Sequence, residues 1–143
     1  GVQPGTQELA PNKSALRSRG AIRIISWVGF QMIGQGGRVF VQSTEPPEFE
    51  LLGTEPDLIV VDFPNSRLHS KNDGLRLETG WFPTAVLWIE AKQLKSNVTR
   101  VFIKLREVVA YDVRQEDNYV FLDFRAPKGP VTAPSISTSR AEQ

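Results

Sequence analysis

Residues 38–41 read Arg-Val-Phe-Val, and residues 100–103, which lie 62 positions later, read Arg-Val-Phe-Ile. The likeness continues to the end of each half, because Leu-Ile-Val-Val-Asp-Phe at 58–63 is matched by Tyr-Val-Phe-Leu-Asp-Phe at 119–124, at an offset of 61. Turns tolerate the loss of a residue, so a one-residue change of offset fits a deletion within a turn. The sequence therefore predicts two copies of one structural unit.

Each copy has the pattern of short β-strands. β-branched and aromatic residues alternate with polar ones, and turn residues interrupt them at intervals of about ten positions. We expect four strands in each copy, over about 21–65 and 85–126, and an all-β fold: a sandwich of two sheets with about eight strands. The order of strand pairing stays open, because each copy can form its own sheet or exchange strands with the other. The predicted core consists of Val39, Val41, Ile59, Val61, Phe63, Val101, Ile103, Val120, Leu122 and Phe124.

Some local features follow from the same pattern. Gly34, Gly36 and Gly37 are expected to supply the positive-φ residues of a turn. Asp62 and Asp123 are expected to face away from the core, as hydrogen-bonding groups at strand edges and turns.

Length and composition limit the possible classes of protein. The chain has 143 residues, which suits one domain, here expected at 21–126. A flexible tether is expected at 1–20, and a Pro/Ser/Thr-rich linker at 127–143. The small excess of positive charge lies on these ends, which argues against nucleic acid as a partner. The sequence contains no run of about 18 apolar residues, so no membrane-spanning helix is predicted. It also does not open with a charged-then-apolar leader, so we expect any export signal to have been removed.

The reactive side chains in the sequence do not favour catalysis. The chain has no cysteine and one histidine, His69, which excludes cysteine zinc sites and a multi-histidine metal cage. No Gly-x-Ser-x-Gly elbow supports a serine nucleophile. We therefore expect no enzyme activity, no metal and no cofactor, and a binding role remains.

The duplicated unit also resembles a known family. Residues 55–65 (Glu-Pro-Asp-Leu-Ile-Val-Val-Asp-Phe-Pro-Asn) and 100–105 (Arg-Val-Phe-Ile-Lys-Leu) are similar to motifs of the AMIN domain, and the resemblance covers about 21–127. AMIN domains are non-catalytic periplasmic modules of bacterial cell-wall amidases and type IV pilus secretins. The resemblance implies a periplasmic module that binds peptidoglycan and positions a secretin pore in the envelope. The long spacer and the lack of an amidase zinc motif favour the secretin over the amidase.

A binding site for peptidoglycan needs two kinds of side chain. Aromatic rings offer flat apolar faces to sugars, and arginine can meet a carboxylate with two parallel hydrogen bonds. In the strand at 85–91, Trp88 is expected to share a face with Val86 and Glu90. We expect the ligand-binding groove to be lined by Arg38, Arg100, Trp81 and Trp88, with Arg67 and Arg76 as further contributors.

Two alternatives stay open. Phe40 and Phe102 can instead form a second apolar layer that their neighbouring arginines merely cover. The module can also be a protein-docking domain that adds a strand at a sheet edge. Its partner would then be a neighbouring secretin subunit or another pilus envelope protein.

Overall fold

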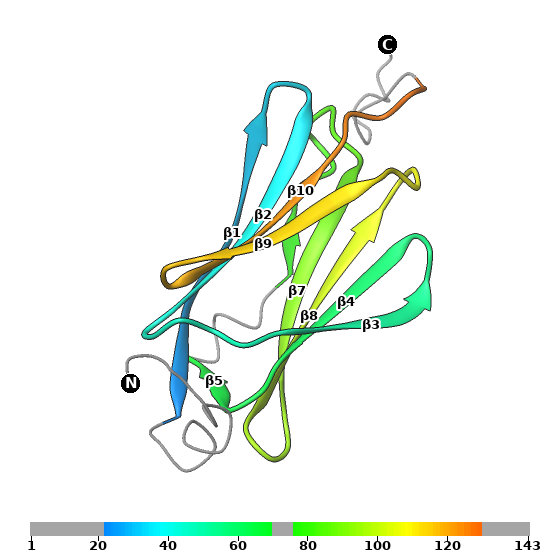
Figure 1. The fold of residues 1–143 in the computed structure, drawn as a ribbon. Helices are drawn as coiled ribbons and strands as arrows, with labels where there is room; N and C mark the ends of the chain where they lie inside the picture. The colour runs from blue at the N-terminus through cyan, green and yellow to red at the C-terminus, as the bar shows by residue number, and fades with distance from the viewer. Residues whose placement is uncertain (1–21, 70–75, 130–143) are drawn as a thin grey trace.

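The structure, a computed structural model, describes residues 22–69 and 76–129. In these ranges the chain forms ten strands and no helix, and the strands make two five-stranded sheets that pack face to face (Figure 1). The all-β sandwich is thus confirmed. The two strands beyond the expected eight are short ones at the sheet edges. The predicted tether at 1–20 lies outside the described residues, and so does all of the predicted linker after residue 129.

The bounds of the strands show how each sheet is built. The first sheet contains, in spatial order, β5 (Ser66–Leu68), β1 (Arg23–Ile33), β2 (Gly36–Ser43), β10 (Tyr119–Phe124) and β9 (Tyr111–Glu116). The second sheet contains β3 (Glu50–Glu55), β4 (Leu58–Phe63), β8 (Val98–Leu105), β7 (Val86–Leu94) and β6 (Leu77–Glu78). Only β1 and β5 pair in parallel; the other pairs described here are antiparallel.

The two copies exchange strands. In the first sheet β1 and β2 of the first copy join β10 and β9 of the second, and in the second sheet β3 and β4 join β8 and β7. The registers agree as well, because Arg38 lies opposite Asp123 between β2 and β10, just as Arg100 lies opposite Asp62 between β8 and β4. The pairing that the sequence left open is therefore an exchange, and each sheet contains half of each copy.

The space between the sheets is filled by alternate residues of the central strands. Every residue of the predicted core is buried. The structure adds further buried apolar residues from β1, β7, the end of β8 and the segments beside β7 and β8: Ile25, Ala85, Val86, Ile89, Ala91, Leu105 and Val109. Burial of this much apolar surface is the main force that holds two sheets together.

A β-bulge changes which residues of β7 face the core. The register shifts between Val86 and Trp88, so Val86 lies on the buried side with Ile89, while Trp88 lies on the other side with Glu90. The expectation that Val86 shares a face with Trp88 was wrong, because the extra residue of a bulge breaks the period of two. A shift occurs at the equivalent place in β1, between Ile25 and Trp27, so the bulge belongs to the repeated unit.

The three glycines at the turn from β1 into β2 have two different roles. Gly34 has a φ of 61° and forms the turn as expected. Gly36 and Gly37 do not have positive φ values, so that part of the expectation was wrong; they are strand residues where other atoms approach closely. A Cβ on Gly36 would lie 2.5 Å from the backbone oxygen of Phe124, and one on Gly37 would lie 2.8 Å from the Phe30 ring.

The described residues include neither a membrane-spanning helix nor a metal-binding cluster. Within 22–69 and 76–129, no helix has the length and apolar character needed to cross a bilayer. In the same ranges, no group of three or more His, Asp or Glu side chains is placed to hold a metal ion.

Candidate functional site

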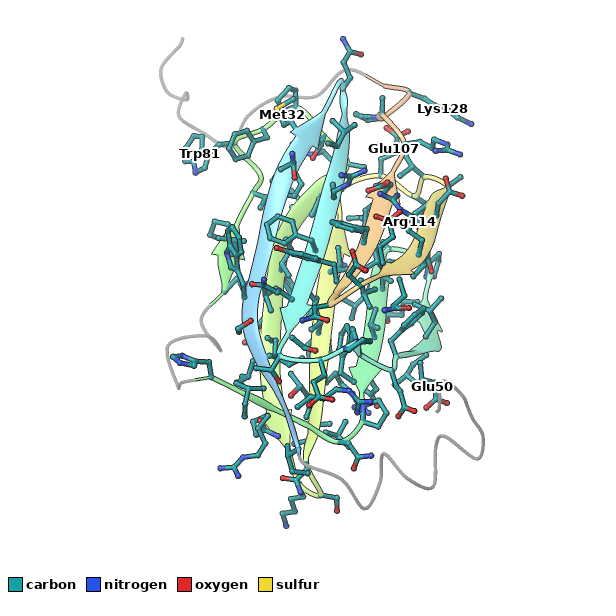
Figure 2. All side chains as sticks on the ribbon, turned by 60° about the vertical axis from the view of Figure 1, so that its left-hand side comes forward. Met32, Glu50, Trp81, Glu107, Arg114 and Lys128 are labelled. Atoms are coloured by element: carbon teal, nitrogen blue, oxygen red, sulfur yellow. The ribbon has the colours of Figure 1, made fainter. Side chains whose placement is uncertain are left out.

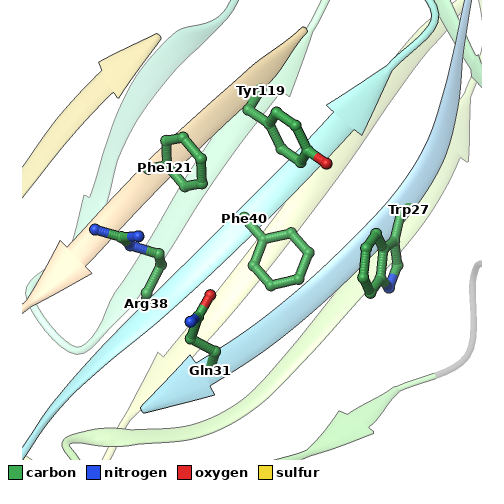
Figure 3. Close-up of a pocket in the computed structure, with 6 residues that line it drawn as sticks. All are labelled: Trp27, Gln31, Arg38, Phe40, Tyr119 and Phe121. Carbon is green, nitrogen blue, oxygen red and sulfur yellow. The ribbon is translucent and has the colours of Figure 1, made fainter. Parts of the chain in front are cut away.

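Four aromatic side chains gather on the outward side of the first sheet. Trp27 comes from β1, Phe40 from β2, and Tyr119 and Phe121 from β10. They surround a shallow hollow of about 290 Å³. Two polar side chains, Gln31 and Arg38, also line it (Figure 3). We call this group the aromatic face; its members are Trp27, Gln31, Arg38, Phe40, Tyr119 and Phe121.

The rings of the aromatic face form a continuous row across three strands. Trp27 meets Phe40 edge-to-face, with 4.9 Å between ring centres and an angle of 87° between the planes. Phe40 lies 6.4 Å from Tyr119, and Tyr119 stacks on Phe121 at 5.3 Å with planes 11° apart. Such offset and edge-to-face pairs are the favourable arrangements for aromatic rings. Trp27 is 54% exposed, so the row has an accessible ring at its β1 end.

The absence of a side chain at Gly29 leaves room for this row of rings. After the bulge, residues 27, 29 and 31 of β1 point to the same side as the aromatic face. A Cβ on Gly29 would lie 2.4 Å from Cζ of Phe40, so the Phe40 ring occupies the space that any other residue would need. The missing side chain lets Phe40 lie across β1 and reach Trp27.

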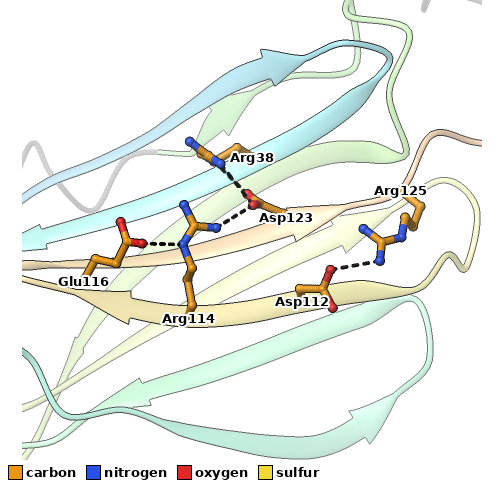
Figure 4. A network of polar contacts seen from close by, with 6 residues as sticks. All are labelled: Arg38, Asp112, Arg114, Glu116, Asp123 and Arg125. Carbon is orange, nitrogen blue, oxygen red and sulfur yellow. Dashed lines mark hydrogen bonds and ion pairs between the residues drawn. The ribbon is translucent and has the colours of Figure 1, made fainter.

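Ion pairs border the aromatic face at its β10 end (Figure 4). Arg38 donates from Nε to Oδ1 of Asp123 at 2.7 Å and from Nη2 to Oδ2 at 3.1 Å. Arg114 donates from Nη1 to Asp123 and from Nε to Glu116, both at 3.0 Å. The Cζ atoms of both arginines also lie 4.8 Å from the centre of the Phe121 ring, within range of a cation–π contact.

These ion pairs shift the pKa values of two members of the network, Asp123 and Arg114. Hydrogen bonds from Arg38, and then from Arg114, lower the pKa of Asp123. Hydrogen bonds to Glu116 and Asp123 raise the pKa of Arg114. Both shifts favour the charged form of the group concerned, the carboxylate of Asp123 and the guanidinium of Arg114.

The equivalent positions on the second sheet form a different surface. Arg100 pairs with Asp62 at 2.7 and 3.0 Å, as Arg38 does with Asp123. The positions equivalent to Tyr119 and Phe121, however, are the aliphatic Leu58 and Val60. The aromatic row is therefore absent from the described part of the second sheet.

Trp88 is the equivalent of Trp27, but a cation covers it. The Cζ atom of Arg76 lies 3.9 Å from the centre of the Trp88 ring, and its Nη2 donates to Glu90 at 3.2 Å. Glu90 stands where the first copy has Gly29. The open ring-lined hollow thus belongs to the first sheet.

The six residues predicted to line one groove do not lie together. Arg38 is on the first sheet, whereas Arg100, Trp88 and Arg76 are on the outer side of the second, with the core between them. Arg67 is exposed on the short edge strand β5. Trp81 is 55% exposed, and Figure 2 shows it with Met32 at one end of the sandwich. Contact of each residue with a ligand stays a prediction; a single groove lined by all six does not form.

Most of the aromatic face was not predicted from the sequence. Trp27, Tyr119 and Phe121 were not among the predicted site residues, although Tyr119 and Phe121 lie two positions apart in a strand and so share its side. That spacing shows a common side but not which strands are neighbours, and the bulge in β1 obscures the side on which Trp27 lies.

The fold and the aromatic face together define a β-sandwich module with a surface suited to binding. The model of one family, the AMIN domain, matches residues 28–124, which is more than half of the chain. The chain therefore belongs to the AMIN family, whose members are periplasmic or envelope modules for targeting and binding. Only this non-catalytic domain is found in the chain. No curated protein matches the sequence significantly.

Proposed function

We propose that this AMIN domain binds peptidoglycan through the aromatic face and thereby anchors its protein in the cell envelope. The observation that supports the proposal is the row of four rings on an open sheet surface. Sugar rings present flat C–H surfaces, which pack on aromatic faces and leave the hydroxyl groups in water. Of the four rings, Trp27 is exposed, Tyr119 and Phe121 are partly exposed, and Phe40 is buried beneath them. An accessible apolar patch of this kind marks a binding surface.

The setting we propose is the periplasmic part of a type IV pilus secretin, in which the module holds the pore in position. The family membership allows this setting, and the Pro/Ser/Thr-rich composition of 127–143 suits a spacer to a further domain. The targeting domain of a cell-wall amidase is the alternative, and the identity of the neighbouring domains in the full-length protein will distinguish the two.

Sedimentation with insoluble cell-wall sacculi tests the binding function. We expect the protein to be depleted from the supernatant, and Trp27→Ala to reduce that depletion strongly. Trp88→Ala is the matched control, because Trp88 is the equivalent residue on the second sheet and is covered by Arg76. No depletion of the wild-type protein contradicts the proposed function. Depletion that depends on Trp88 and not on Trp27 places the site on the second sheet instead.

A second candidate function is protein docking, which the open edge of the first sheet at β9 favours. β9 ends the first sheet, and no described strand pairs with its outer side. Close to the edge strands β3 and β9 lies a hollow of about 360 Å³ whose lining includes Val108 and Tyr111, and Val108 is 57% exposed. Docking of a neighbouring subunit by strand addition predicts concentration-dependent self-association in analytical ultracentrifugation, and Val108→Asp should abolish it.

A further inference from the structure

We propose that the aromatic face recognises the glycan strand of peptidoglycan, a chain of neutral N-acetylated amino sugars, and not the carboxylates of the peptide stems. The inference rests on the proposed function, because it names the part of the polymer that the same site holds. It also differs from the sequence-based expectation, in which the arginines were to meet carboxylates.

The arginines of the site are already paired with carboxylates of the protein. Nε and Nη2 of Arg38 are bound by Asp123, and Nε and Nη1 of Arg114 are bound by Glu116 and Asp123. A ligand carboxylate would have to displace one of these acceptors or lie beside it. The first choice exchanges one ion pair for another, and the second places like charges together, so an acidic ligand gains little.

The neutral hydrogen-bonding groups of the site are, in contrast, available. In the part of the chain that the structure describes, no protein group accepts a hydrogen bond from Nε1 of Trp27 or from the hydroxyl of Tyr119, and none bonds the amide of Gln31. All three side chains line the hollow beside the rings (Figure 3). An indole N–H, a phenol and a carboxamide together offer the donors and acceptors that sugar hydroxyl and acetamido groups need.

The shape of the site suits a polymer. Its volume of about 290 Å³ is at the lower limit for small-molecule pockets, which span about 300–1,000 Å³. The rings form a row across β1, β2 and β10 and do not enclose a cavity. Such a surface can hold part of a chain while the rest of the ligand extends over the sheet.

Comparison of the two copies predicts how many glycan segments one domain binds. The second sheet has aliphatic residues where the first has Tyr119 and Phe121, and Lys92 stands where the first has Gln31. A domain with two related halves is therefore expected to bind one glycan segment, and not two.

The decisive probe is chitotetraose, a tetramer of N-acetylglucosamine without charge, lactyl ether or peptide. Titration calorimetry with the full chain should show binding of one molecule per chain. Trp27→Ala should weaken it about tenfold, a loss of the size that one aromatic contact provides. Phe82→Ala, which removes an exposed ring away from the aromatic face, should change the affinity less than twofold. Thermal unfolding of each variant shows whether it is folded.

The dependence of the affinity on salt concentration is a second test of the inference. Between about 0.05 M and about 0.5 M NaCl the affinity should change little, because attraction between opposite charges is screened and stacking is not. Isolated stem tetrapeptide should neither bind nor compete. The inference is overturned if the peptide binds and chitotetraose does not, or if high salt abolishes the binding of chitotetraose. Either result overturns it even if the protein still sediments with sacculi. Failure to sediment with sacculi contradicts the proposed function whatever chitotetraose does.

Discussion

Arg38 of the first copy and Asp123 of the second form a bidentate ion pair between the neighbouring strands β2 and β10, with N–O distances of 2.7 and 3.1 Å. Arg100 and Asp62 repeat this pair in the other sheet. In both cases the arginine and the aspartate come from different copies. The pairs therefore lie on the seams at which the two copies exchange strands.

The first prediction concerns these seams. We expect Arg38→Met to lower the free energy of unfolding by about 1 kcal/mol, as for a partly exposed, well-formed ion pair. Arg100→Met should also lower it, because it removes the equivalent pair with Asp62. The effects should add in the double variant, because the residues lie on opposite sheets without a shared partner. Urea denaturation measures both. By contrast, Arg38→Met and Asp123→Asn should be non-additive; additivity there would show that the ion pair contributes nothing.

The second prediction is a dependence of stability on acid pH. The arginines lower the pKa of Asp123 in the folded state, so the folded protein binds fewer protons than the unfolded chain at acid pH. The resulting stability is present above the unfolded pKa of about 3.9 and is lost as the pH falls through the lower folded value. The melting temperature should thus be stable near neutrality and fall below about pH 4.

The variant Asp123→Asn is the control for this dependence. It should be less stable than the wild type at pH 7 and should lose less stability on acidification, because one carboxylate with a lowered pKa has been removed. Asp57 and Glu107 also have lowered pKa values, owing to Lys104 and to the backbone N–H groups of Lys128 and Gly129, so part of the acid dependence should remain. Equal acid dependence in both proteins would contradict the role of Asp123.

The third prediction distinguishes two glycines in strands. Gly36→Ala should destabilise the fold by about 2 kcal/mol or more, because the new Cβ would lie 2.5 Å from a backbone oxygen that cannot easily move. Gly53→Ala is the control, because nothing lies within 4 Å of its Cβ position. It should be neutral or stabilising by up to about 1 kcal/mol. Similar losses for both in chemical denaturation would contradict the packing argument.

The fourth prediction separates binding from stability at Gly29. The atom that a Cβ would meet is the end of the Phe40 ring, which can turn away, so Gly29→Ala should remain folded. The displaced ring would, however, interrupt the contact of Phe40 with Trp27. We expect weaker depletion by sacculi with only a modest loss of melting temperature. If the variant is depleted from the supernatant as strongly as the wild type, the contact between Phe40 and Trp27 is not needed for binding.

Local pattern was sufficient for the core and insufficient for the site. Alternation in a strand separates buried from outward residues, which is why Val39, Val101 and Leu122 were placed correctly. It does not say to which sheet an outward residue belongs. Arg38 and Arg100 have the same local sequence, and the predicted groove combined them although they are on opposite faces.

The sequence by itself determined the duplicated unit, the all-β class and the buried side of the central strands, because these depend on spacing within a few residues. The tertiary structure alone decided the exchange of strands, the bulges in β1 and β7, and the meeting of Trp27, Phe40, Tyr119 and Phe121 in one row. The physical reason is that an aromatic surface depends on which strands become hydrogen-bonded neighbours. That choice is made by packing the whole sandwich, and it joins residues of β1 and β10 that are about ninety positions apart in the chain.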